Sequence, residues 1–343
     1  MLIGRDCPTF IIAEAGVNHN GSIDLAKELI AKAAECGADC IKFQTFKADK
    51  IVLRDTEKAE YQKKNTGSQE SQFKMLQNLE MPTAWYPELI EECRRHNLIF
   101  LSTPYDTSDI AFLEEFNLPA YKVASAWAVE PVFLKALAKT MKPILLSTGM
   151  CTGAEVYEAV QTIRECGNNK IILLQCTTNY PSRNEDCNLM AMKNMGKSLN
   201  VLTGYSDHTQ GLAAATLSVG LGASVIERHF TLDKSFPGPD HSSSSDPEEF
   251  AQLVVAVKES EKILGNGIKT PCAAEIINKK AMRRSIVAAC DIPKGTRISN
   301  EHIAYKRPAT GVSPKHAEHM IGRISAKDIA KDSFLYFNDL SVR

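Results

Sequence analysis

Short apolar segments rich in β-branched residues alternate along most of the chain with longer amphipathic segments. Stretches such as 22–38 and 153–167 repeat apolar residues every three to four positions, which predicts helices, and Ser22 is placed to cap the first of them. Strand and helix patterns alternating eight times predict a (β/α)8 TIM barrel, and the number of units disfavours the competing doubly wound open sheet. The predicted strands cover residues 10–16, 40–46, 99–105, 120–125, 143–149, 171–177, 201–208 and 224–230.

The spacing of these segments also divides the chain. The one long interval, after the second predicted strand, holds a polar insertion at 47–72, which we expect on the C-terminal face where barrel active sites lie. The pattern lapses into a charged connector at 265–283, and short strand-like segments with Gly and Pro turns follow. We therefore predict a barrel domain at 1–264, a linker at 265–283 and a small β-rich domain at 284–343.

Composition restricts the kind of partner. Forty basic and forty-one acidic residues give a net charge of -1, so no long-range field favours nucleic acid or a membrane surface, and a small-molecule partner is expected. The ten cysteines contain no C-x-x-C pair, and we interpret them as reduced thiols. The first residues lack signal-peptide features and no apolar run approaches the length of a membrane span, so we expect a cytoplasmic protein.

Polar residues occupy one face of several predicted strands. Glu14 alternates with apolar neighbours, Lys42 and Gln44 share a face, and Glu227 and His229 do the same near the end of the last strand. A barrel strand that is covered on both sides should be almost wholly apolar. These groups therefore indicate a site at the strand C-termini, with satisfied structural polar groups as the alternative.

The stretch GYSDHTQG at 204–211 raises three interpretations. A nucleophile elbow G-x-S-x-G would need a glycine at His208, and the consecutive Ser206, Asp207 and His208 cannot align as nucleophile, base and orienting group. A metal site has more support, because His208 and His229 end adjacent predicted strands, and two imidazoles suit a divalent ion such as Mn²⁺, with zinc or iron as alternatives. Two satisfied loop histidines remain the plain alternative.

Several residues at predicted strand ends are suited to an anion. Lys42, Lys122, Ser125 and the STG sequence at 147–149, which precedes a predicted helix, each offer a positive charge, a hydroxyl or free N–H groups. One such feature would mean little. Together they favour an anionic substrate.

These segments resemble the sialic acid synthase family, which makes N-acetylneuraminic, legionaminic and pseudaminic acids. The resemblance runs through both predicted domains, and the C-terminal one resembles that family's antifreeze-like SAF domain, with a β-clip-like fold. The matching segments are AEAGVNHNGS, KFQTFKADK, KAEYQKKNTGSQESQ, FLSTPYD, LLSTGM, TTNYPS, GYSDHTQG, ERHFTLDKSFPGPDH and KRPATGVSP.

The resemblance implies a metal-dependent condensation of phosphoenolpyruvate with an open-chain N-acyl mannosamine-type sugar, giving a nine-carbon 2-keto acid and phosphate. It implies that His208 and His229 bind the divalent metal, foremost Mn²⁺ with Mg²⁺ or Co²⁺ as alternatives, and that Glu14 assists proton transfer. It also implies a domain-swapped homodimer in which Arg307 reaches the sugar's N-acyl group in the other subunit; by itself, Arg307 reads as solvated surface charge. The implied phosphoenolpyruvate contacts are Lys42, Thr103, Lys122, Ser125, Ser147 and Ser206, with Lys42 and Lys122 catalytic, and the implied sugar contacts are Gln44, Tyr180 and Asp240.

One position departs from the family pattern. Trp127 stands in KVASAW where the family commonly has a glutamate that contacts the sugar. Two hypotheses account for it: the acceptor is less polar there, as a deoxy or acylamino sugar would be, or Glu130 replaces the lost carboxylate. Asp207 has no assigned role and is expected either to orient the histidine or to close the turn.

Other functions remain as alternatives. A pseudaminic-type synthase would differ in its sugar pocket, and a 3-deoxy-sugar-phosphate synthase would need a second basic cluster for the acceptor phosphate, which the sequence lacks. A non-catalytic carbohydrate-binding homologue is the third alternative, and the presence of Glu14, Lys42, Lys122 and both histidines counts against it.

Overall fold

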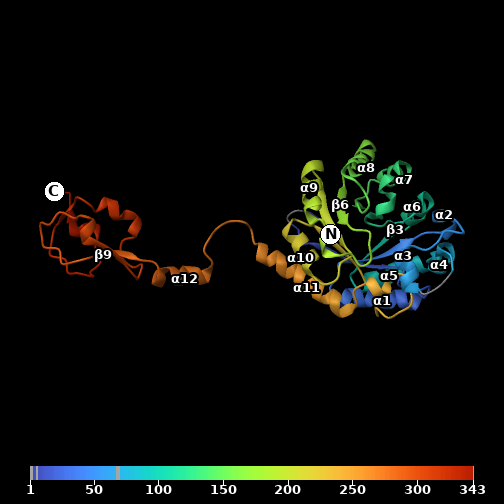
Figure 1. The fold of residues 1–343 in the computed structure, drawn as a ribbon, viewed down its shortest axis with the longest axis horizontal. Helices are drawn as coiled ribbons and strands as arrows, with labels where there is room; N and C mark the ends of the chain where they lie inside the picture. The colour runs from blue at the N-terminus through green and yellow to red at the C-terminus, as the bar shows by residue number, and fades with distance from the viewer. Residues whose placement is uncertain (1–2, 5–6, 67–69, 343) are drawn as a thin grey trace. The chain divides into compact units, whose positions relative to one another are not determined.

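The computed structural model describes residues 3–4, 7–66 and 70–342, and they form two compact units, Met1–Gly265 and Asn266–Arg343. The larger unit is a barrel of eight parallel strands surrounded by helices (Figure 1). β1 pairs with both β2 and β8, and β3 and β4 lie next to each other at the remaining seam. The barrel predicted from the alternating pattern is therefore confirmed.

All eight predicted strands occur in the described part of the chain, each within a few residues of its predicted bounds. They are β1 (Phe10–Gly16), β2 (Cys40–Thr45), β3 (Ile99–Pro104), β4 (Tyr121–Val123), β5 (Ile144–Ser147), β6 (Ile171–Cys176), β7 (Leu202–Asp207) and β8 (Val225–His229).

The helices between the strands begin at side chains that satisfy free backbone N–H groups. Ser22 caps α1 by accepting from the N–H of Leu25, while Thr152 and Asp246 form capping boxes at α8 and α11. In the described residues no helix is both long and apolar enough to cross a membrane. The helices of the barrel layer are α1 (Ile23–Glu35), α5 (Tyr86–Arg95), α6 (Thr107–Glu114), α7 (Pro131–Ala138), α8 (Gly153–Glu165), α9 (Leu189–Leu199), α10 (Ala213–Gly220) and α11 (Pro247–Leu264).

The polar insertion after β2 contains short helices. It contains α2 (Ala48–Ile51) and α3 (Glu60–Thr66), and α4 (Gln72–Asn78) begins at its end. Met75 and Leu79 pack with Val17 and Phe46 in a small apolar cluster of their own. This cluster anchors the insertion beside the C-terminal ends of β1 and β2, the face on which we expected it.

The main core lies between the strands and the helices, and a second apolar cluster fills the N-terminal end of the barrel lumen. That second cluster contains Phe10, Ile12, Cys40, Leu101, Leu145, Ile172, Leu174 and Val225. The inward-facing residues that follow them on the same strands lie nearer the C-terminal end of the lumen. Apolar side chains therefore fill the N-terminal end of the lumen.

The smaller unit has two short antiparallel pairs around its own core, which includes Ile286, Ile298 and Leu335. Within the segment expected to be a linker, residues 273–282 form a helix, α12, in which Glu275 accepts from the N–H of Cys272. Ala, Glu, Ile and Lys at these positions favour a helix even without buried residues. The strands of this unit are β9 (Ser285–Ala288), β10 (Ile303–Lys306), β11 (Ile324–Ser325) and β12 (Leu340–Ser341).

Candidate active site

Four charged side chains lie buried together at the C-terminal end of the barrel lumen. Lys42 Nζ lies 2.6 Å from Glu14 Oε2 and 3.7 Å from Glu227 Oε2. Lys122 Nζ lies 3.5 Å from Glu227 Oε1. All four residues are 5% exposed or less. Two cations and two carboxylates thus meet where strand geometry points the inward residues of β1, β2, β4 and β8 at one another.

The two carboxylates differ in acidity. Burial raises the pKa of Glu14 to about 7, although Lys42 opposes the change. Burial acts in the same direction on Glu227, but Lys122, Lys42 and the hydrogen bond from Ser206 outweigh it and hold the Glu227 pKa below its ordinary value. Near neutral pH, Glu227 is therefore a fixed negative charge and Glu14 is able to gain or lose a proton.

The two lysines also differ. Burial lowers the pKa of Lys122, and Glu227 only partly offsets this effect. For Lys42 the same burial is outweighed by Glu14 and Glu227, so that its pKa is raised. Lys42 is consequently the more firmly charged cation of the pair.

Hydroxyl groups surround this charged cluster. Thr103 Oγ1 accepts from Lys42 Nζ at 2.9 Å, and Ser206 Oγ donates to Glu227 Oε1 at 2.8 Å. Ser125 Oγ accepts from the N–H of Gly149 at 3.0 Å. Ser147 Oγ is buried without a hydrogen-bond partner among the described residues, which suits a group that binds a ligand. Lysines and hydroxyls in this arrangement are able to hold a small anion.

The two predicted histidines meet beside the charged cluster. The ring centroids of His208 and His229 lie 5.4 Å apart, and the ring of Tyr180 lies 4.3 Å from His208. His208 Nδ1 hydrogen-bonds the Thr177 carbonyl oxygen at 2.7 Å, which leaves its other ring nitrogen available. Asp240 lies nearby, and burial raises its pKa to about 6, with His208 opposing.

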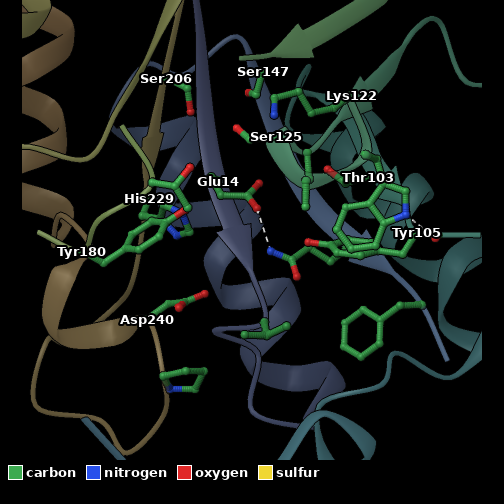
Figure 2. Close-up of a pocket in the computed structure, with 18 of the residues that line it drawn as sticks. Glu14, Thr103, Tyr105, Lys122, Ser125, Ser147, Tyr180, Ser206, His229 and Asp240 are labelled. Carbon is green, nitrogen blue, oxygen red and sulfur yellow. Dashed lines mark hydrogen bonds between the residues drawn. The ribbon is translucent and has the colours of Figure 1, made fainter. Parts of the chain in front are cut away.

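A pocket of about 410 Å³ connects the charged cluster, the histidines and an apolar wall. Figure 2 shows Tyr180, His229 and Asp240 on one side of Glu14, with Thr103 and Tyr105 on the other. Gln44 Nε2 donates to Glu14 Oε1 at 3.2 Å. Of the residues expected to form the site, those that line the pocket are Glu14, Lys42, Gln44, Thr103, Lys122, Ser125, Ser147, Tyr180, Ser206, His208, His229 and Asp240.

Trp127 forms part of the apolar wall. It lies in the 3-10 helix Ser125–Val129 that follows β4, its Nε1 donates to the Tyr105 carbonyl oxygen at 2.7 Å, and the two rings meet edge to face at 4.5 Å. Phe46, Met75 and other apolar side chains line the same pocket. Glu130 is exposed and does not line it, so the structure gives no support to a replacement carboxylate at that position.

Asp207 and Arg307 do not line the pocket. Asp207 points away from the pocket, where it pairs with Arg228 and accepts from the N–H of Thr209, so the turn-closing interpretation fits its contacts. Arg307 is an exposed residue of the smaller unit. Its predicted role toward the sugar stays a prediction.

Comparison with known proteins gives two family matches. The NeuB family matches residues 29–269, and the SAF domain matches residues 283–341. The chain belongs to the NeuB family. This agrees with the resemblance drawn from the motifs, and the SAF match agrees with the small C-terminal domain.

Named relatives extend over nearly the whole chain. It is 43% identical to the N,N'-diacetyllegionaminic acid synthase of Legionella pneumophila, over 93% of this chain and 91% of the relative. It is 34% identical to a pseudaminic acid synthase of Campylobacter jejuni, over 94% of each chain. The crystal structure of an N-acetylneuraminic acid synthetase from Leptospira borgpetersenii superposes with a TM-score of 0.71 at 31% identity, covering 80% of this chain and 91% of that one.

Glu227 is the main residue of this pocket to which the sequence patterns assign no role. It contacts both lysines and Ser206, whereas the alternation of its strand indicates only that it shares a polar face with His229. The same alternation that identified Lys42 and His229 places Glu227 in the lumen. A rule that assigned every inward charged residue to the site would have found it.

The histidines fit a metal only as part of an open site. No group of three or more His, Cys, Asp or Glu side chains suited to a metal occurs in the described part of the chain. However, His229 Nδ1 is buried without a hydrogen-bond partner there, and His208 keeps one ring nitrogen free of its bond to Thr177. Two nitrogen donors beside a substrate pocket fit a divalent ion whose other ligands are water or substrate oxygens.

Proposed function

We propose that this protein condenses phosphoenolpyruvate with the open-chain form of an N-acyl mannosamine-type sugar, releasing phosphate and a nine-carbon 2-keto sugar acid. The observation that carries the proposal is the buried pair Lys42 and Lys122 at the base of the pocket, among hydroxyls and beside two histidines. Phosphoenolpyruvate bears a phosphate and a carboxylate, and two buried cations are suited to both charges. The membership in the NeuB family and its named synthases supports the same reaction.

Different residues of the pocket serve different steps of the proposed reaction. C3 of the enolpyruvate forms a bond to the aldehyde carbon of the sugar, whose oxygen takes up a proton. Water then adds at C2, and phosphate leaves with cleavage of its C–O bond. Glu14, with a pKa of about 7, is suited to take the proton from this water, while Lys42, Lys122, Thr103 and Ser147 hold the anion.

We propose that His208 and His229 hold Mn²⁺, with Mg²⁺ and Co²⁺ as alternatives for the test. A divalent ion there supplies Lewis-acid polarisation of the aldehyde oxygen. The contribution of the chain is to present two imidazoles next to the pocket, with His208 oriented by its hydrogen bond to Thr177.

We propose a legionaminic-type acceptor, a 2,4-diacetamido-trideoxy sugar. The Trp127 indole N–H is committed to the Tyr105 carbonyl, so this wall presents a ring face and edge where a glutamate would accept hydroxyl bonds. An apolar wall favours a methyl group over a hydroxymethyl group, because a buried hydroxyl without a partner is unfavourable. The greater identity to the legionaminic than to the pseudaminic acid synthase points the same way.

The deciding experiment is incubation of the full chain with phosphoenolpyruvate, Mn²⁺ and a panel of acceptors, following phosphate release. The panel contains N-acetylmannosamine, the 2,4-diacetamido-trideoxy sugar of the legionaminic series and its pseudaminic counterpart. We expect the highest kcat/KM with the legionaminic-series sugar and none in chelator-treated protein. If none of the acceptors on the panel supported phosphate release, the proposed function would be contradicted. A preference for N-acetylmannosamine would contradict only the proposed acceptor.

We also propose the predicted division into a barrel (1–264), a linker (265–283) and a SAF domain (284–343), with a domain-swapped homodimer in which Arg307 completes the partner's pocket. The cytoplasmic location stays a prediction.

Mixing Arg307→Ala protein with His208→Ala protein, each inactive alone, should restore about a quarter of the wild-type activity. Half of the dimers are then mixed, and each mixed dimer has one intact site. No recovery after subunit exchange would contradict the swap.

A further inference from the structure

A buried ion pair lies on the outer side of the barrel wall, directly behind the two histidines. Asp207 ends β7 and Arg228 lies in β8, at paired positions of the two strands, and Arg228 Nη2 contacts Asp207 Oδ2. The two side chains are 0% and 5% exposed. Outward strand positions of a barrel are normally covered by helices and apolar, so two charges at this place require an explanation.

Both residues of the ion pair also form hydrogen bonds to the loops that follow β7 and β8. Asp207 Oδ1 accepts from both the N–H and the hydroxyl of Thr209, each at 2.8 Å. Arg228 Nη2 donates to the Gly211 carbonyl at 2.8 Å, and Nη1 contacts Ser245 Oγ at 3.4 Å. The pair therefore joins the end of β7, the turn after it and the loop after β8.

The two histidines are the immediate neighbours of this pair in sequence. His208 follows Asp207 and His229 follows Arg228, and successive strand residues point to opposite faces. The backbone of His229 is held from the same side, because the N–H of Ser245 donates to its carbonyl at 2.8 Å. A shift of either outer residue would displace the histidine next to it.

We propose that Asp207 and Arg228 are positioning residues that set the distance and orientation of His208 and His229, and thereby the affinity for the divalent metal. The inference rests on the proposed metal site. An apolar pair would hold the two strands together without desolvating charges, and replacement of a buried ion pair by apolar residues is often neutral for stability. What such residues would not supply is the set of directed bonds to Thr209, Gly211 and Ser245.

The test is Mn²⁺ binding to metal-free protein without substrates, measured by calorimetry and by the electron paramagnetic resonance of free Mn²⁺. Asp207→Asn should weaken binding by about 10- to 100-fold, the usual range for residues that orient metal ligands. Ile226→Ala is the matched control, because Ile226 is fully buried, faces outward on β8 and pairs with Tyr205 rather than with the ion pair. It should lower the melting temperature and leave the Mn²⁺ Kd within about threefold.

A second pair of variants separates positioning from stability. Asp207→Leu with Arg228→Met should melt near the wild-type temperature and still bind Mn²⁺ about tenfold more weakly or worse. Should Asp207→Asn not fold, Thr209→Ala removes one bond to Asp207 and is expected to weaken binding by a few-fold. Wild-type Mn²⁺ affinity in the folded double variant would overturn the proposal.

These outcomes are distinguishable from failure of the proposed function. A wild-type protein that binds Mn²⁺ without condensing the substrates would overturn the function and leave the positioning role standing. A wild-type protein that binds no divalent ion would overturn the positioning role itself.

Discussion

The two ends of the barrel lumen differ in character within two residues along the same strands. On β1 Ile12 precedes Glu14, and on β2 Cys40 precedes Lys42. The residues of the N-terminal, or lower, end belong to an apolar cluster, and those of the C-terminal, or upper, end form a buried charged cluster that lines the pocket. Because strand geometry points both kinds of residue inward, the difference arises from side-chain chemistry alone.

The two ends therefore contribute differently to the stability of the fold. The lower cluster gains from the burial of apolar surface. The upper one buries charges whose desolvation is unfavourable, as the raised pKa of Glu14 reflects. Natural proteins depart from the rules of a stable core mainly at functional sites. Substitutions at the C-terminal end should therefore reduce activity most, whereas substitutions at the N-terminal end should reduce stability and leave activity nearly unchanged.

The largest loss of activity is expected for Glu14→Gln. A base with a pKa of about 7 is protonated below that pH, so wild-type kcat/KM should fall about tenfold per pH unit on the acid side. The variant keeps the size of the side chain but lacks the base and one of the two acceptor oxygens that face Lys42 and Gln44, and it should lose about 10²- to 10⁴-fold in rate together with the acid limb. The measurement is phosphate release between pH 5 and 9. An unchanged acid limb in the variant would assign the proton transfer to another group.

Lys42→Met should make the upper end of the lumen resemble the lower one. Loss of one of two cations that face the anion is expected to reduce kcat/KM by about 10²- to 10³-fold. It also leaves Glu14 and Glu227 with less compensation, so the protein should melt at lower temperature. Lys27→Met, at an exposed pair with Glu88, is the control and should stay within about twofold in both respects. Near-normal turnover by Lys42→Met would remove the lysine from the site.

Trp127→Glu should change which sugar is used more than how fast the enzyme works. A carboxylate in place of the indole favours an acceptor with a hydroxyl there, and the ratio of kcat/KM between the N-acetylmannosamine and the diacetamido sugar should rise by about tenfold or more. Trp127→Phe keeps an apolar wall, loses the bond to the Tyr105 carbonyl, and should keep the wild-type preference. An unchanged ratio in Trp127→Glu would argue against the acceptor hypothesis.

The smallest effect on activity is expected at the lower end of the lumen. Leu101→Ala removes a buried side chain from the apolar cluster and should reduce the free energy of unfolding by about 2–5 kcal/mol, measured by denaturant titration. Below its melting temperature the variant should keep kcat within about twofold, since Thr103 two residues on is unchanged. A loss of kcat comparable to that of Lys42→Met would erase the distinction between the two ends.

Much of this site followed from local patterns in the sequence. Strand alternation placed Glu14, Lys42 and His229 on the inner face, and the helical pattern and Ser22 cap predicted α1. The same patterns left out helix α3 in the polar insertion and helix α12, which has no buried residue and therefore weak periodicity. Residues 67–69 of the polar insertion lie outside the described part of the chain.

The sequence by itself determined the barrel, the small C-terminal domain and the polar face of β1, β2 and β8, because periodicity of two and of 3.6 residues is a local property. Only the tertiary structure decided that Glu227 lies between Lys42 and Lys122, that Glu130 stays outside the pocket, and that Asp207 pairs with Arg228 behind the histidines. These contacts join residues far apart in the chain, and closure of the barrel is what brings them within bonding distance.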